Sequence, residues 1–307
     1  MDKVQNTSFK PIFILGLHRS GTTVLYRMLN ETGNFNFLSL YHVLNFDKLI
    51  YNHINDLEMK EKQKINNLLK EKGIVNRKTD NIEVSSDYEH EYCYIFSERN
   101  LSSKINNNNK ELFETMCKKI QFISENNKPL LLKNPHDYPN FLLIKKLYPN
   151  AKFVFIHRNP LEVISSIMRL WTTRFKSKDE FLTLYSKQYD LVYKNPILLF
   201  STKFYYTAKF PPGIFEVIWR SKNATSYFLK NINNLSKDDY ISIEYGNLCE
   251  EPDENMKKIL DFLGLRTNIK FGKYIKPRKL KLIPEVIFLR KFIYKRMKSY
   301  FEYFGYH

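Results

Sequence analysis

The stretch that decides the fold runs from Pro11 to Gly33 and reads PIFILGLHRSGTTVLYRMLNETG. Its first five residues are apolar, as in a buried strand, and Gly16 ends that run. A short polar loop follows, and apolar residues then recur at helical spacing: Val24, Leu25, Met28 and Leu29. The order strand, loop, helix points consecutive backbone N–H groups and the positive end of the helix dipole at one spot. We therefore expect this loop to bind a phosphate.

The loop from Gly16 to Thr23 departs from the P-loop of nucleoside triphosphatases. That motif requires a Lys directly after its second glycine, where this chain has Thr22, and the cation lies earlier, at Arg19. The loop instead resembles the 5′-phosphosulfate-binding loop of sulfotransferases that use 3′-phosphoadenosine 5′-phosphosulfate (PAPS), especially the bacterial-type branch with Arg-Ser-Gly-Thr-Thr. The resemblance implies that the 5′-phosphosulfate is bound by Arg19, Ser20, Gly21, Thr22 and Thr23. It also implies a catalytic role for Arg19 in stabilising charge on the leaving oxygen.

A second motif follows the apolar run Phe153–Ile156. Arg158 comes two residues after this run, Pro160 stands where a helix would begin, and Ser166 lies eight residues after Arg158. Arginine suits a phosphate because its planar fork donates two parallel hydrogen bonds. The pattern resembles the 3′-phosphate-binding motif of the same family. It implies that Arg158 and Ser166 grip the ribose 3′-phosphate.

A third cation, Lys133, ends the apolar run that begins at Leu130. Open α/β sheets bind ligands at the carboxyl ends of their strands, so we expect Lys133 to meet the same anion as Arg19. Members of the resembled family have Lys-Ser-Pro or Lys-Asp-Pro here, and their lysine approaches the transferred sulfuryl group. This chain keeps the lysine and the proline but has Asn134 between them.

The late part of the chain adds a cofactor contact and a basic segment. We predict a strand over Tyr240–Leu248 and a helix over Asp253–Leu263, a unit that resembles the family element whose tyrosine, here Tyr245, lies against the adenine. Eleven Lys or Arg residues then lie between Lys270 and Lys298, against one acidic residue. By resemblance, the cation that closes over the 3′-phosphate is one of Lys273, Lys276 or Arg278.

One candidate for the general base follows the first helix. His42 lies 23 positions after Arg19, about where family members often carry a Glu or His base. A histidine suits the role because its pKa lies close to working pH. The alternative is a packed histidine without a catalytic role, and the sequence leaves both interpretations open.

Further candidates come from an acidic-aromatic segment, Ser85–Tyr94. It resembles the Glu-x-Glu-aromatic segment of one large group of bacterial sulfotransferases, which makes Glu91 the second candidate base, with Glu89 behind it. The alternative is a solvated helix face with alternating charge. His136, which follows Lys133-Asn134-Pro135, is a weaker candidate.

Strand–loop–helix units recur at 11–33, 130–148, 152–170 and 240–263, which predicts an α/β fold with a central parallel sheet flanked by helices. We expect one sulfotransferase domain over 1–307, with a core over 11–264 and a basic C-terminal loop and helices over 265–307. Residues 172–235 carry no motif. They are expected to form helices and a loop over the cleft that supply acceptor specificity.

The composition indicates which ligands the protein binds and in which cellular compartment it is expected. The formal charge of +17, from 49 Lys and Arg against 32 Asp and Glu, favours polyanionic ligands. Three widely spaced cysteines suggest neither a disulfide framework nor a metal site. No apolar leader and no run near the ~20 residues of a membrane span are apparent. We expect a cytoplasmic protein, with peripheral contact at the inner membrane surface through the amphipathic segment Ile283–Tyr294 as a secondary expectation.

The activity implied by the resemblance is transfer of a sulfuryl group from PAPS to an acceptor hydroxyl or amine by in-line displacement, without a metal. Adenosine 3′,5′-bisphosphate (PAP) is the implied product. A small molecule, a glycan or a glycolipid is the expected acceptor, and no nucleic acid is expected. One alternative is a P-loop kinase or nucleoside triphosphatase, which lacks its lysine here. Another is a basic nucleic-acid-binding or membrane-binding protein, which leaves the two spaced phosphate motifs unexplained.

Overall fold

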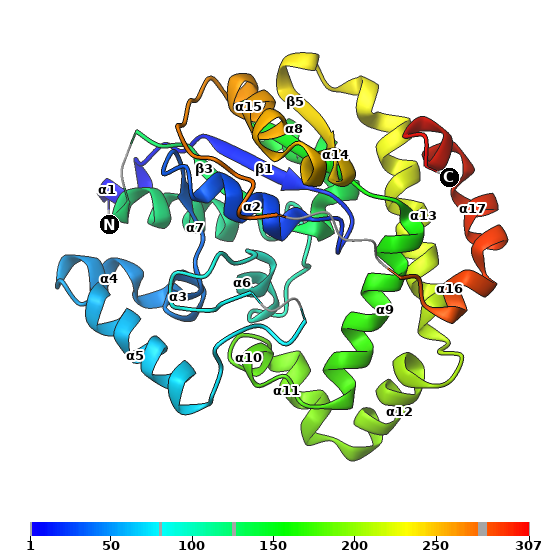
Figure 1. The fold of residues 1–307 in the computed structure, drawn as a ribbon. Helices are drawn as coiled ribbons and strands as arrows, with labels where there is room; N and C mark the ends of the chain where they lie inside the picture. The colour runs from blue at the N-terminus through cyan, green and yellow to red at the C-terminus, as the bar shows by residue number, and fades with distance from the viewer. Residues whose placement is uncertain (1, 80–81, 125–126, 276–280, 307) are drawn as a thin grey trace.

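Five parallel strands form one sheet at the centre of the computed structural model, which describes residues 2–79, 82–124, 127–275 and 281–306 (Figure 1). The strand order is β2-β3-β1-β4-β5. The strands are β1 Pro11–Leu15, β2 Asn36–Phe37, β3 Leu130–Lys133, β4 Lys152–His157 and β5 Tyr240–Glu244. The predicted α/β fold with a central parallel sheet is confirmed.

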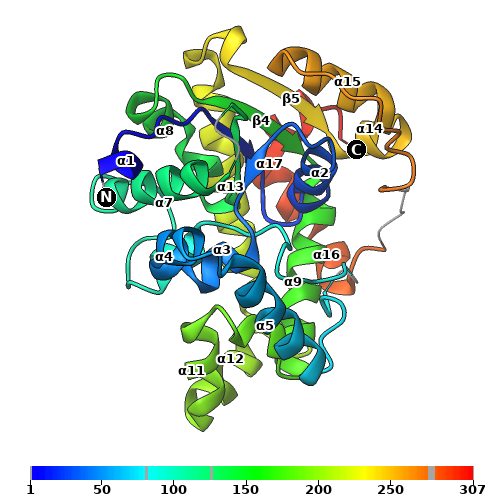
Figure 2. The same ribbon diagram turned by 90° about the vertical axis from the view of Figure 1, so that its left-hand side faces the viewer.

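Helices cover both faces of the sheet and extend beyond its carboxyl edge (Figures 1 and 2). In the first half of the chain they are α1 Asp2–Gln5, α2 Thr22–Asn30, α3 Leu40–Leu44, α4 Leu49–Ile54, α5 Glu58–Glu71, α6 Cys93–Ser97, α7 Lys110–Ile123 and α8 Phe141–Leu147. The second half has α9 Pro160–Lys176, α10 Glu180–Thr183, α11 Lys187–Lys194, α12 Pro196–Thr207, α13 Gly213–Asn231, α14 Tyr245–Glu250, α15 Pro252–Leu263, α16 Pro284–Phe288 and α17 Arg290–Tyr303. None of these helices, within the part of the chain described, is long and apolar enough to cross a membrane.

Alternation along the buried strands divides the core into two layers. Phe13 and Leu15 of β1 point to the face covered by α7, α9 and α13. Ile12 and Ile14 point to the opposite face, where α2, α14 and α15 pack. Every residue of β1 is buried, as expected for the central strand of a parallel sheet covered on both faces.

The strand register gathers the predicted site at one edge. Ile14 of β1 pairs with Lys133 at the end of β3, and Leu15 pairs with Phe155 of β4. Because the strands are parallel, the loops after β1, β3, β4 and β5 leave the sheet at the same edge. Three of the four sequence motifs lie in the loops after β1, β4 and β5, and the fourth, Lys133, is the last residue of β3.

Two element boundaries differ from the prediction. The strand expected over Tyr240–Leu248 ends at Glu244, because Tyr245 begins α14. The single amphipathic helix expected over Ile283–Tyr294 is divided at Leu289 into α16 and α17. Helices do fill residues 172–235, as predicted.

Candidate active site

The loop after β1 is shaped by two residues in the left-handed region of the backbone. Arg19 has φ 69° and Gly21 has φ 106°. The turn is closed by Ser20, whose backbone N–H and hydroxyl both donate to the Leu17 carbonyl, at 3.1 and 2.7 Å. Successive N–H groups in such a turn form an anion-binding nest ahead of the α2 N-terminus. Non-glycine residues rarely adopt a positive φ, and those that do are concentrated at functional sites.

Two glycines allow neighbouring groups to approach this loop closely. A Cβ atom at Gly16 would collide with the Ile156 carbonyl oxygen and the Ser20 hydroxyl. A Cβ atom at Gly21 would collide with the Tyr245 ring. The loop is therefore packed against β4 and α14, and its shape depends on the absence of side chains at these two positions.

The two phosphate motifs interlock. Nε of Arg19 donates a hydrogen bond to the Ser166 hydroxyl of α9 at 3.1 Å. Nη1 of Arg158 donates to the backbone carbonyl of Arg19 at 3.3 Å. Arg158 is buried, and its Nε also donates to Glu162 Oε2 at 2.8 Å. The structure thus brings together residues that lie nearly 150 positions apart, as the sequence predicted.

Tyr245 joins this cluster from α14. The guanidinium carbon of Arg158 lies over the Tyr245 ring, 4.2 Å from its centroid, in a cation–π contact. The ring therefore lies close to both the Arg158 guanidinium and the Gly21 backbone. Sequence reasoning did not single out Glu162, although its position four residues after Arg158 on a helix is a signal for such a pair.

Lys133 connects the loop to the acidic-aromatic segment. Its side chain is 1% exposed, and its Nζ donates to Thr23 Oγ1 at 2.9 Å. The same Nζ forms an ion pair with Glu91 Oε1 at 3.0 Å. Among the candidate bases, Glu91 is thus joined directly to the predicted sulfuryl site.

The pKa values of Glu91 and of two histidines near this pair are shifted. Burial by itself raises the pKa of Glu91, but the Lys133 ammonium and then His18 outweigh it and lower that pKa to about 2. Burial, and then the neighbouring His136, lower the pKa of His18 to about 3. The two imidazole rings meet edge to face with centroids 4.6 Å apart. At neutral pH the site holds an ionised carboxylate beside two neutral histidines, since burial also lowers the pKa of His136.

His42 occupies a different environment. Its Nδ1 accepts a hydrogen bond from the backbone N–H of Ser39 at 3.1 Å. The backbone N–H of His42 donates to the Ser39 hydroxyl, which completes a capping box at the start of α3. It lines a cavity of about 410 Å³ together with Glu58 and Lys62. Burial, and then Lys62, lower the pKa of His42 to about 4. The described contacts of His42 do not include Lys133 or the loop after β1.

The remaining predicted residues are dispersed. Glu89 is buried and accepts a hydrogen bond from the Asn30 amide at 3.0 Å. Lys273 is exposed, with its ammonium over the Tyr274 ring. Lys276 and Arg278 lie outside the described residues. Within the residues that the structure covers, no group of three or more His, Cys, Asp or Glu side chains is arranged to hold a metal ion.

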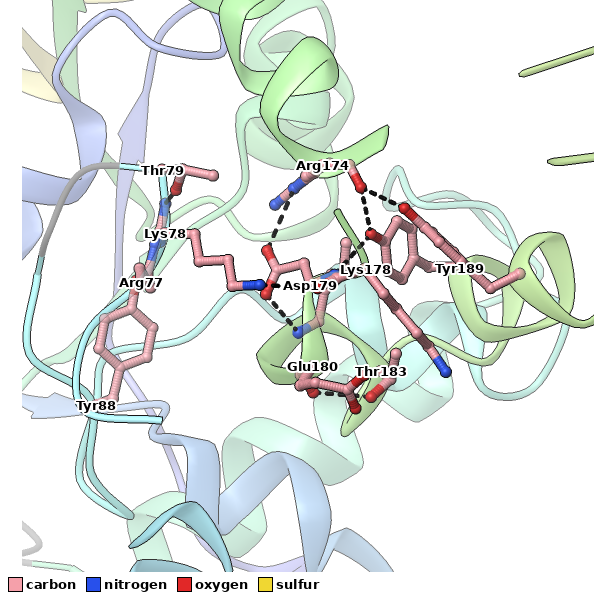
Figure 3. Close-up of polar contacts among 12 residues, drawn as sticks. Arg77, Lys78, Thr79, Tyr88, Arg174, Lys178, Asp179, Glu180, Thr183 and Tyr189 are labelled. Atoms are coloured by element: carbon pink, nitrogen blue, oxygen red, sulfur yellow. Dashed lines mark hydrogen bonds and ion pairs between the residues drawn. The ribbon is translucent and has the colours of Figure 1, made fainter. Parts of the chain in front are cut away.

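Arg174, at the last turn of α9, is a cation that the sequence analysis missed (Figure 3). Its side chain is only 14% exposed, and its Nε lies 3.9 Å from Asp179 Oδ2, which is too far for a hydrogen bond. That buried Nε has no hydrogen-bond partner among the described residues. Its backbone carbonyl accepts the hydroxyls of Tyr189 and Tyr193, at 2.8 and 2.6 Å, which anchors the helix end.

Arg174 lies close enough to His18 to act on it electrostatically. It contributes to the lowered pKa of His18, whereas Arg220 and Lys104 contribute to the lowered pKa of His136. Cations from three separate segments, Lys104, Arg174 and Arg220, therefore act electrostatically on these two histidines. No motif in the sequence marks them, because they converge only through the packing of helices.

Comparison with known proteins decides the class of this site. Residues 11–268 match the model of the sulfotransferase family. The chain belongs to this family. The enzyme class predicted from the two phosphate motifs is thereby confirmed, and the kinase and nucleic-acid-binding alternatives lose their support.

Solved sulfotransferases share the fold. Sulfotransferase STF1 from Mycobacterium tuberculosis aligns over 97% of this chain and 79% of its own, with a TM-score of 0.61 and 14% identity. Sulfotransferase STF9 from Mycobacterium avium aligns over 98% of this chain and 70% of its own, with a TM-score of 0.59 and 14% identity. No curated protein matches the sequence at a significant level.

Proposed function

We propose that this sulfotransferase moves a sulfuryl group from PAPS to an acceptor hydroxyl or amine, with Glu91 as the general base. The observation that carries the proposal is the position of the Lys133–Glu91 pair directly beside the interlocked clamp of Arg19, Ser166 and Arg158. The clamp supplies two arginines and a hydroxyl for phosphate groups. The pair supplies a cation and a carboxylate for the transfer.

The donor set of the site fits PAPS. The nest at Arg19–Gly21 and the α2 N-terminus offer backbone N–H groups to the 5′-phosphosulfate. Arg158 and Ser166 lie beside that nest and would hold the 3′-phosphate, and Tyr245, which contacts Arg158, would lie against the adenine. When bound, PAPS supplies the activated sulfuryl group. A direct displacement asks the protein mainly to align the acceptor and to stabilise developing charge.

Glu91 is held in an unreactive state by its partner. With a pKa of about 2, a carboxylate paired to Lys133 is a weak base. An anion bound at the loop competes with Glu91 for the charge of Lys133, because both negative groups attract the same buried ammonium. Loss of that partner leaves burial as the dominant influence, which raises the pKa of the carboxyl toward working pH. One carboxylate oxygen then accepts the proton of the acceptor hydroxyl.

The acceptor side favours a small molecule, glycan or glycolipid that carries a negative group. Arg174 has a buried Nε without a hydrogen bond, and Lys104 and Arg220 add charge near His136. A carboxylate, sulfate or phosphate on the acceptor would satisfy Arg174 with two parallel hydrogen bonds. A cytoplasmic location remains a prediction of the sequence.

Calorimetric titration with PAP tests the cofactor assignment. Wild-type protein is expected to bind PAP, and Arg19→Ala and Arg158→Ala are each expected to weaken binding roughly 10- to 100-fold, the value of a charge-assisted hydrogen-bond set. Arg99→Ala is the matched control, since Arg99 forms its ion pair with Asp47 at the surface. A folded wild-type protein without measurable affinity for PAP would overturn the proposal.

A further inference from the structure

Exposed aromatic side chains gather where four segments meet. The loop before α13, the start of α13, α16 and the start of α17 lie side by side on the side of the molecule that carries α12 and the C-terminus (Figure 1). Phe288 is 80% exposed and Trp219 is 64% exposed. We define the aromatic patch as Phe210, Phe215, Trp219, Phe288 and Phe292, all of them exposed.

The rings of the patch touch one another while facing solvent. The Phe210 ring lies 6.0 Å from that of Phe288 and 6.1 Å from that of Phe215, between centroids. Phe215 in turn lies 6.5 Å from Phe292. Trp219 is one helical turn beyond Phe215 on α13. Contiguous exposed apolar surface of this kind marks an interaction site more often than isolated exposed residues do.

These aromatic residues are not needed to fill the core. The inward side of α16 and α17 is provided by other residues that are buried: Val286, Ile293, Met297, Tyr300 and Phe301. Phe288 and Phe292 are therefore additional apolar groups on the outward side of the same two helices. None of the five residues of the patch belongs to either buried cluster of the described fold.

Cations surround the patch. Arg290 and Lys291 lie two and three residues after Phe288 and are exposed, and the Arg296 guanidinium lies over the Phe292 ring at 5.1 Å. From Pro284 to Tyr303 there are five Lys or Arg residues and two Glu residues. The nearby Glu216 is already paired with Arg220 at 2.5 Å. The rim of the patch is consequently positive.

We propose that the aromatic patch binds the surface of a membrane that contains anionic lipid. Phe and Trp rings above a basic rim are the combination that interfacial helices use, with rings at the acyl boundary and cations at the phosphates. A second copy of this chain is disfavoured, because docking patch to patch would bring the two positive rims together. The core of a protein interface is also usually depleted of charge, whereas here the Arg296 guanidinium lies over the Phe292 ring.

Vesicle co-sedimentation tests this proposal with the full chain. Wild-type protein is expected to sediment with vesicles of phosphatidylcholine and phosphatidylglycerol and to stay in solution with pure phosphatidylcholine. Phe215→Ala/Phe288→Ala and Arg290→Gln/Lys291→Gln are each expected to lower partitioning at least 10-fold, and binding to fall steeply with salt. Tyr51→Ala/Met59→Ala removes two exposed apolar side chains elsewhere and is expected to bind like the wild type.

Two readouts keep the result interpretable. PAP binding by the patch variants shows that they are folded and is expected to be unchanged, so failure of this proposal is separable from failure of the cofactor assignment. Sedimentation velocity identifies a competing occupant: a dimer that Phe215→Ala/Phe288→Ala dissociates would overturn the membrane assignment. Equal vesicle binding by the wild type and the patch variants, or none by the wild type, would overturn it as well.

Discussion

The proposed donor side, which is the phosphate clamp with Lys133, and the proposed acceptor side around Arg174 are built in different ways. On the donor side, Lys133 and Arg158 lie at or just after strand ends, and backbone register brings them to one edge. On the acceptor side, contacts join segments that have no register in common. Lys78 Nζ, for example, donates to the carbonyl of Lys178, 100 residues away, at 2.9 Å (Figure 3). The comparison teaches that strand ends position the residues of the proposed cofactor site, whereas contacts between helices and loops position the residues around Arg174.

The largest expected effect concerns the group that links the two sides. Glu91→Gln is expected to lower kcat roughly 10²- to 10⁴-fold, the usual contribution of a general base, while PAP affinity changes only a few-fold. His42→Ala is the comparison variant, because His42 caps α3 and contacts neither Lys133 nor the loop. It is expected to lower stability more than turnover. The measurement is initial rate with saturating PAPS and any accepted substrate. Full activity in Glu91→Gln with loss of activity in His42→Ala would reverse the assignment.

A smaller effect is expected from disturbing the donor side alone. Gly21→Ala places a methyl group against the Tyr245 ring at φ 106°. Strain of about 1–3 kcal/mol in the phosphate loop corresponds to PAP binding roughly 5- to 150-fold weaker. Gly246→Ala, with no atom within 4 Å of the added methyl, is expected to leave PAP affinity within about twofold. Equal affinities of the two variants by calorimetry would contradict this account of the loop.

The smallest effect is expected on the acceptor side. Arg174→Gln removes one cation that lacks a hydrogen bond at Nε, so PAP affinity is expected to stay unchanged. KM for an anionic acceptor is expected to rise about 10-fold, as for loss of one charge-assisted contact, while KM for its neutral analogue stays constant. Steady-state rates with paired acceptors, such as 4-hydroxybenzoate and its methyl ester, check this. An equal change in both KM values would show that Arg174 acts on structure rather than on charge recognition.

Predictability from sequence follows the same division. The positions of the loop after β1, Lys133 and Arg158 at one sheet edge were predictable, because an apolar run that ends in a glycine or a cation marks a strand end at the ligand edge. Ser166, inside α9, was singled out only through the family resemblance. The choice between Glu91 and His42 was not, since it depends on how the segment before α6 crosses the site. Arg174 carried no signal, because a lysine or arginine in the last turn of a helix is common.

Two further features needed the folded chain. The aromatic patch combines Phe210 and Phe215 with Phe288 and Phe292, and the amphipathic pattern of the C-terminal segment predicted only the second pair. The end of β5 at Glu244 also differed from the expected strand. Gly246 and Asn247, which follow it closely, are residue types depleted in strands, and α14 begins at Tyr245.

Helix α9 carries a consequence for the size of the acceptor. Its first turns present Ser166 to Arg19, and its last turn presents Arg174 eight residues later. At 1.5 Å per residue these two positions are about 12 Å apart along one rigid axis. The helix therefore sets the separation between the two anion contacts. Under the proposed function, an acceptor whose negative group binds Arg174 therefore has that group about 12 Å along α9 from the cofactor contact at Ser166.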